Sequence, residues 1–173
     1  LFAPEWEEVS VFLQPESGSA RGLELFVKRD VGDRLSWWAS YALAQVEESL
    51  DGQTVPANQD QRHTIYLDCS WRPSLAWRLT AAWQYRSGWP FTQRQFVRVE
   101  VPDGEWPFRD GFGPRNGVRL PAYHRLDLRV NRYFEVGDGR LSVFLEVINL
   151  YDRENVRDIL PGNQRQIIDG ELV

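Results

Sequence analysis

The residues best suited to chemistry lie in the long segment 89–123, where aromatic and basic side chains are interspersed. Arginine pairs with anions and stacks on aromatic rings, and exposed aromatic rings bind planar or sugar-like groups. The segment is therefore predicted to bind a small-molecule or glycan ligand that is anionic or aromatic, such as an iron chelate. The alternative is that these rings pack together and only order the loop. The candidate ligand-binding residues are Trp89, Arg94, Trp106, Phe108, Arg109 and Arg115.

Motifs for catalysis are absent from the sequence. There is no GxSxG, HExxH, P-loop or glycine-rich dinucleotide fingerprint. The acidic pairs Glu7–Glu8 and Glu47–Glu48 are expected to be solvated carboxylates in loops or at strand ends. We predict no catalytic residues and no cofactor, so the protein is not expected to be an enzyme.

Metal binding is not predicted either. Cys69 is the single cysteine, and His63 and His124 are isolated from other ligand types. The stretch 103–111 holds carboxylates and glycines, but their spacing is not that of a calcium-binding EF-hand loop. These residues therefore give no metal-ligand pattern.

Composition limits the class of protein. The chain has 173 residues, a formal charge of −5 and eight tryptophans. A net negative charge gives no support to nucleic-acid binding. No stretch of about 18 apolar residues exists, so no transmembrane helix is predicted. Aromatic enrichment fits a carbohydrate-binding surface or the interfacial belts of a membrane protein.

Alternating hydrophobicity predicts an all-β protein built from an antiparallel up-and-down meander. Apolar and polar residues alternate clearly in HRLDLRVNRYFEV, which begins at His124. The strands are longer than the usual 5–6 residues and match a tilted membrane-spanning strand of about 9–11 residues. Six strands are expected at 22–30, 35–46, 64–72, 77–88, 124–136 and 141–151.

Link lengths alternate between these strands. The links at 31–34, 73–76 and 137–139 are tight, whereas those at 47–63 and 89–123 are long. Outer-membrane barrels have this pattern, with short periplasmic turns and long extracellular loops. We therefore expect strands of a transmembrane β-barrel, located in the bacterial outer membrane, with the aliphatic face towards lipid.

The strand faces give an expected orientation for each side chain, because successive residues of a strand point to opposite sides. The expected lipid-facing residues are Leu23, Leu25, Leu67, Leu79, Leu126, Leu128, Leu141 and Val143. The expected lumen-facing residues are Glu24, Asp68, Arg72, Gln84, Arg86, Asp127, Arg129 and Glu146. Trp37, Trp71, Trp77 and Phe134 share the aliphatic parity near the short turns, where they would form an interfacial belt.

Four stretches resemble the C-terminal barrel region of TonB-dependent outer-membrane receptors. They are SARGLELFVKRDVGDRLSWWASYALAQVEE, NQDQRHTIYLDCSWRP, WRLTAAWQYRSGWPFT and LPAYHRLDLRVNRYFEVGDGRLSVFLEVINLYDRENV, which together span 19–156. The resemblance implies a barrel of about 22 strands with a plug in its lumen. It also implies uptake of a scarce ligand, such as an iron chelate, a cobalamin-like molecule or a glycan, energised through TonB.

On this resemblance, residues 1–173 are the C-terminal portion of such a large transmembrane β-barrel, with about six or seven of its strands, and the plug domain is absent. The expected partners are outer-membrane lipid, the rest of the barrel with its plug, TonB through segments outside this chain, and the ligand. Two alternatives remain open at this point. One is a complete small outer-membrane barrel that acts as an anchor or adhesin, and the other is a soluble, tryptophan-rich, carbohydrate-binding β-sandwich.

Overall fold

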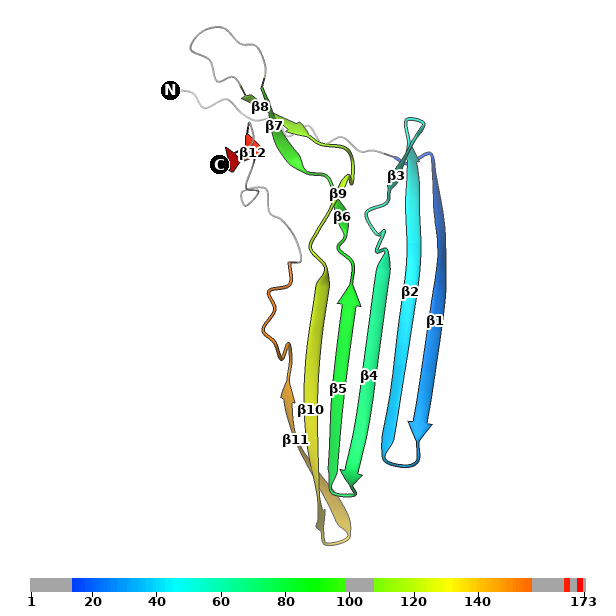
Figure 1. Cartoon of the computed structure of the whole chain (residues 1–173), viewed down its shortest axis with the longest axis vertical. Helices are drawn as coiled ribbons and strands as arrows, with labels where there is room; N and C mark the ends of the chain where they lie inside the picture. The colour runs from blue at the N-terminus through cyan, green and yellow to red at the C-terminus, as the bar shows by residue number, and fades with distance from the viewer. Residues whose placement is uncertain (1–13, 99–107, 157–166, 169–170, 173) are drawn as a thin grey trace.

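The computed structural model describes residues 14–98, 108–156, 167–168 and 171–172, and these form an all-β, antiparallel meander (Figure 1). Six long strands lie side by side in the order β1-β2-β4-β5-β10-β11, and the short β3 pairs with β2 as the seventh strand of the sheet. Their bounds are β1 Ser17–Val31, β2 Leu35–Leu50, β3 Gln53–Pro56, β4 His63–Ser74, β5 Trp77–Arg86, β10 Tyr123–Val136 and β11 Gly139–Val147. The predicted fold class and strand number are thus confirmed.

The three links predicted to be tight, at 31–34, 73–76 and 137–139, lie at one end of the sheet, which we call the turn end (Figure 1). Gly32 and Gly137 have positive φ angles of 57° and 58° in the β1–β2 and β10–β11 turns. Glycine adopts this conformation without the steric cost that other residues meet. The β4–β5 link is only Leu75 and Ala76, and Ser74 Oγ accepts a hydrogen bond from the Ala76 N–H.

The opposite end, which we call the loop end, is more ordered than the sequence predicts. The segment predicted as a loop at 47–63 contains the end of β2, the strand β3 and a tight turn between them. Asp51 and Gly52 occupy this turn with positive φ angles of 50° and 72°. Positive φ at both central residues defines the type I′ hairpin turn, and Asp-Gly is a preferred sequence for it.

The second long link also contains strands. Two short ladders form within it, β6 (Pro90–Phe91) with β9 (Val118–Arg119) and β7 (Arg94–Arg98) with β8 (Phe108–Phe112). A third small ladder pairs β12 (Ile167–Ile168) with β13 (Glu171–Leu172). These elements were missed because each is too short to give a period-2 pattern.

Several predicted strand boundaries are wrong: β1 begins earlier than residue 22, at Ser17, β2 continues beyond residue 46 to Leu50, and β5 ends at Arg86 and not at residue 88. The sixth strand was expected to run to residue 151, but β11 ends at Val147. Asn149 and Asp152 have positive φ angles of 59° and 50°, which end the extended conformation. Asn149 stabilises the bend through its own side chain, which accepts a hydrogen bond from Arg153 N–H and donates one to the Arg153 carbonyl.

The sheet has no hydrophobic core. Among the described residues, Ala57 is the only buried hydrophobic residue, and it lies in a loop. No second layer covers either face of the sheet in this part of the chain (Figure 1). The sandwich alternative therefore lacks its second sheet, and the small-barrel alternative lacks closure.

Candidate functional site

The two faces of the sheet differ sharply in chemistry. Directly paired residues of neighbouring strands share a face, so the register assigns every paired side chain to one of the two faces of the sheet. One row across five strands reads Val27, Ala39, Leu67, Trp83 and Leu126, and the next reads Lys28, Trp38, Asp68, Ala82 and Asp127. We call the first type the apolar face and the second the polar face.

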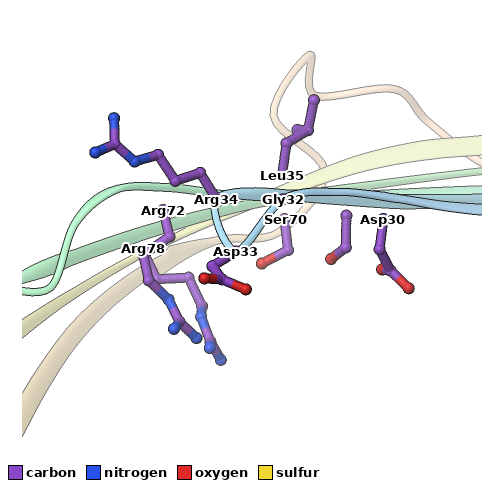
Figure 2. Close-up of a pocket in the computed structure, with 9 residues that line it drawn as sticks. Asp30, Gly32, Asp33, Arg34, Leu35, Ser70, Arg72 and Arg78 are labelled. Carbon is purple, nitrogen blue, oxygen red and sulfur yellow. The ribbon is translucent and has the colours of Figure 1, made fainter.

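The register places the predicted residues consistently on these faces. All eight residues expected to meet lipid lie on the apolar face: Leu23, Leu25, Leu67, Leu79, Leu126, Leu128, Leu141 and Val143. Seven of those expected to line a lumen lie on the polar face: Glu24, Asp68, Gln84, Arg86, Asp127, Arg129 and Glu146. The eighth, Arg72, lies at a break in register, and its side chain points to the same side as Asp30, Ser70 and Arg78 (Figure 2).

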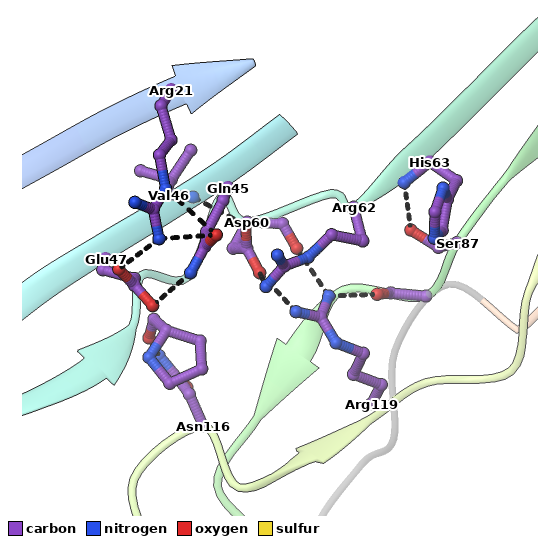
Figure 3. Close-up of polar contacts among 12 residues, drawn as sticks. Arg21, Gln45, Val46, Glu47, Asp60, Arg62, His63, Ser87, Asn116 and Arg119 are labelled. Carbon is purple, nitrogen blue, oxygen red and sulfur yellow. Dashed lines mark hydrogen bonds and ion pairs between the residues drawn. The ribbon is translucent and has the colours of Figure 1, made fainter. Parts of the chain in front are cut away.

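A buried carboxylate organises the loop end of the sheet. Asp60 is fully buried, with 0% of its surface exposed. It accepts a hydrogen bond from Val46 N–H at 2.7 Å and forms ion pairs with Arg119 and, at 3.5 Å, with Arg62 (Figure 3). Arg119 also donates to the Asp60 carbonyl at 2.7 Å and to the Gly88 carbonyl at 3.2 Å. The Asp60 and Arg119 side chains together connect β2, the loop before β4, the exit of β5 and β9.

The pKa of Asp60 is lowered despite its burial. Removal from water opposes ionisation, but the Val46 N–H and the two guanidinium groups favour the charged form and outweigh it. Asp60 is therefore ionised at neutral pH, and its negative charge is shared between the positive charges of Arg62 and Arg119.

Asn116 makes a second connection at the loop end. This buried side chain donates to the Pro56 carbonyl at 2.7 Å and to Asn58 Oδ1 at 2.8 Å, and its backbone N–H donates to Thr92 Oγ1. Its positive φ of 53° is a conformation that asparagine tolerates better than most residues. The segment before β9 is thereby fixed against the loop that follows β3.

A hollow of about 370 Å³ opens beside the Asp60–Arg119 ion pair, between the end of β5 and the start of β10. Arg86 and Tyr123, which are directly paired, line it together with Trp89. The Arg86 guanidinium lies 5.5 Å from the Tyr66 ring centre and 5.7 Å from that of Tyr123, and it donates to Tyr66 Oη at 2.6 Å. The remaining lining residues are Gln61, Ser87, Gly88, Leu120, Asn155 and Val156.

Gly88 makes this hollow possible. A Cβ atom at this position would lie 1.6 Å from the Leu120 carbonyl oxygen. The chain leaving β5 therefore passes against the chain leading to β10, where Leu120 N–H donates to the Trp89 carbonyl at 2.9 Å. Trp89 is held by its backbone while its side chain remains 42% exposed.

The structure divides the six predicted ligand-binding residues among different settings. Trp89 lines the hollow, Arg94 lies 6.0 Å from the Phe112 ring centre between β7 and β8, and Arg115 pairs with Glu48 at 3.8 Å. Phe108 and Arg109 belong to β8 and are described by their backbone alone, and Trp106 lies outside the described residues. Of these six residues, Trp89 is the one that lines the hollow.

Several site residues were missed from the sequence. Asp60, Asn116 and Asn155 are polar residues in apparently ordinary loop stretches, and their partners lie up to 60 positions away. Arg86 and Tyr123 were detectable as polar-face residues at strand ends. Their direct pairing follows only from the β5–β10 register, which skips the whole intervening segment.

The apolar face carries an aromatic band at each end. At the turn end, the Arg132 guanidinium lies 4.8 Å from the Trp77 ring centre and 5.2 Å from that of Phe134. At the loop end, Tyr41 Oη and His63 Nδ1 are 3.0 Å apart, and His124 Nδ1 is 2.8 Å from Tyr151 Oη. Amphipathic rings of this kind suit a boundary between water and an apolar medium.

Comparisons with known proteins return no match among family models, curated proteins or solved structures. Within the described residues, no group of three or more histidine, cysteine or acidic side chains is arranged to hold a metal ion. No helix in this part of the chain is long and apolar enough to cross a membrane.

Proposed function

We propose that this sheet is a wall segment of a bacterial outer-membrane β-barrel of the TonB-dependent receptor class, which takes up a scarce small ligand. The observation that carries the proposal is the burial pattern of β4. Leu67, Cys69 and Trp71 are exposed, whereas Asp68 and Ser70 between them are half-buried. A strand whose apolar residues are its more exposed ones is inverted relative to a water-soluble protein.

Dimensions support the same proposal. Tyr85 and Trp77 lie at the two ends of the apolar side of β5, about 26 Å apart at roughly 3.3 Å per residue. With a strand tilt of about 40°, this corresponds to about 20 Å of membrane thickness, close to the apolar band of about 25 Å in such barrels. The tyrosine–histidine and tryptophan bands would then lie at the two interfaces.

The hollow beside Arg86 and Trp89 supports the receptor role. A guanidinium between two tyrosine rings, with an exposed indole nearby, suits a ligand that combines a negative charge with a flat or sugar-like surface. In the proposed orientation, the loop end is extracellular and this hollow is where the ligand first meets the polar face. The class of ligand is an anionic chelate or an acidic glycan.

Spin labels on neighbouring residues of β10 test the membrane assignment. Labels at Leu128 and Arg129, introduced in a Cys69→Ser background and reconstituted in vesicles, should be accessible to dissolved oxygen and to a water-soluble nickel chelate, respectively. Equal accessibility at both positions would rule out the proposed orientation. The receptor role is tested separately, by binding of the complete gene product to the periplasmic domain of TonB.

A further inference from the structure

A second hollow, of about 330 Å³, lies at the turn end of the polar face (Figure 2). Arg72 and Arg78 extend into the same region from β4 and β5, and the hydroxyl-bearing residues Ser36 and Ser70 face each other directly across β2 and β4. Arg34 also borders the hollow, but its side chain points to the other side of the sheet (Figure 2). This site is at the opposite end of the sheet from the Arg86 hollow.

The strand register brings the two arginines together, because Arg72 directly follows Trp71 and Arg78 directly precedes its partner Leu79. The β4–β5 register shifts between Trp71 and Ser74, so Arg72 is released from regular pairing with β5. Its backbone N–H donates to the Arg34 carbonyl at 2.6 Å, one position beyond the last β2–β4 pair, Leu35 with Trp71. Two cations therefore lie side by side on the polar face at the turn end.

The two guanidinium groups have no ion-pair partner among the described residues. Other arginines of the polar face have partners: Arg86 bonds to Tyr66, Arg125 pairs with Asp127 at 2.8 Å, and Arg129 bonds to Asn131. Within the described chain, by contrast, neither Arg72 nor Arg78 forms a side-chain hydrogen bond or ion pair.

Two acidic side chains, Asp30 and Asp33, also line the hollow, but neither forms an ion pair with Arg72 or Arg78. Asp30 pairs with Lys28 at 3.4 Å, and Asp33 lies near the arginines without forming an ion pair in the described residues. Like charges at neighbouring positions of a sheet destabilise it. An anion between the two guanidiniums would remove that repulsion.

We propose that Arg72 and Arg78, with the Ser36 and Ser70 hydroxyls, form an oxyanion-binding site. Two guanidinium groups offer paired N–H donors that match a phosphate or carboxylate, and charge-assisted bonds of this kind are about twice as strong as neutral ones. The oxyanion comes from a free phosphate or from the carboxylate side chains of a polypeptide seated against the polar face. The site does not depend on what covers the apolar face.

Titration of the chain refolded in detergent micelles tests the site and its source. One arm uses inorganic phosphate, followed by ³¹P line broadening, and the other uses a fluorescent hexaglutamate peptide, followed by anisotropy. Arg72→Gln and Arg78→Gln should each weaken binding about tenfold or more, because each removes a charged donor. Arg34→Gln is the matched control and should leave binding unchanged, since its side chain points away.

Each outcome is decisive. Phosphate binding that is lost in both variants supports the site with a free ion as its source. Peptide binding alone, lost in the same variants, supports it with a polypeptide as its source. The proposal is overturned if neither probe binds, or if Arg34→Gln weakens binding as much as Arg72→Gln does. Near-ultraviolet circular dichroism of each variant separates lost binding from lost folding.

Discussion

At the scale of single residues, the loop end depends on a few side chains that each connect several segments. Asp60 compensates Arg62 and Arg119, and its backbone carbonyl receives a further bond from Arg119. Removal of one partner from such a group leaves buried charge without compensation, which costs more than the pair contributes. The hollow beside Arg86 is adjacent to this group of ion pairs. Gln61, which directly follows Asp60, and Gly88, whose carbonyl accepts a bond from Arg119, both line the hollow.

Asp60→Asn should lower the free energy of unfolding by about 1–3 kcal/mol at neutral pH, because a charged acceptor is lost. The folded pKa of Asp60 is lowered, so its stabilisation is present above the unfolded value of 3.8 and is lost as pH falls through the folded pKa. The difference between the variant and the parent should therefore shrink below about pH 4. Denaturant unfolding in micelles from pH 7 to pH 3 measures this. Asp138→Asn, in an exposed turn, is the control.

Gly88→Ala should destabilise the loop end by about 1–3 kcal/mol, because the added Cβ has no room against the Leu120 carbonyl. Gly18→Ala on β1 is the control, since its Cβ would meet the nearest atom at an ordinary 3.6 Å. Thermal unfolding of both variants gives the comparison. Equal melting temperatures would show that the close approach at Gly88 is not required.

At the scale of elements, the segment after β11 completes the sheet with side chains as well as backbone: Leu150 N–H donates to the Leu126 carbonyl at 2.7 Å. The side chain of Asn155 accepts a bond from His124 N–H and donates to the His124 carbonyl, both at 3.0 Å. Asn149 N–H donates to Asp127 Oδ1 at 2.9 Å. The edge of β10 beyond β11 is therefore covered, and an uncovered edge invites pairing with another chain.

Asn155→Ala should expose the His124 amide to solvent, because no other described group accepts its hydrogen bond. Hydrogen exchange at His124 should accelerate, whereas exchange at Val130, which lies between β5 and β11, should not change. Glu154→Ala, an exposed neighbour, is the matched control. Slow exchange at His124 in the Asn155 variant would mean that the side-chain pairing does not protect this edge.

The six long strands could be predicted from the sequence because each repeats its pattern over at least nine residues. The ends of the strands and the short ladders at the loop end could not be predicted from the sequence. β11 stops early at an asparagine bend whose geometry depends on Arg153, and β6 pairs with β9 across a long separation in sequence. Likewise, Asp60 differs from a solvated loop aspartate only through partners that the fold brings to it. Period-2 patterns report the two faces of a strand, but they carry no information on long-range loop contacts.

At the scale of the whole molecule, one large apolar surface decides how the chain behaves in water. The side chains of Leu25, Leu67, Trp71, Leu141 and Val143 are each between 43% and 54% exposed on the same face. Soluble monomers rarely show contiguous apolar patches above a few hundred Å². Both outer strands, β1 and β11, also present backbone groups along their open sides. A lipid environment with closed strand pairing removes both problems together, because spanning strands in lipid need every backbone group paired.

Because detergent or lipid covers the apolar face, the chain should self-associate less in detergent or lipid than in plain buffer. Sedimentation velocity in buffer and in micelles measures the difference, and Leu25→Gln combined with Leu67→Gln should reduce association in buffer because it interrupts the apolar face. Ser40→Gln combined with Ser70→Gln changes the polar face by the same number of residues and should not. A monomeric, cooperatively melting chain in buffer would contradict the membrane proposal, because these leucines would then have to be covered by the protein itself. Association that the polar-face variant reduces equally would locate the contact at the open strand edges or the polar face, and not at the apolar surface.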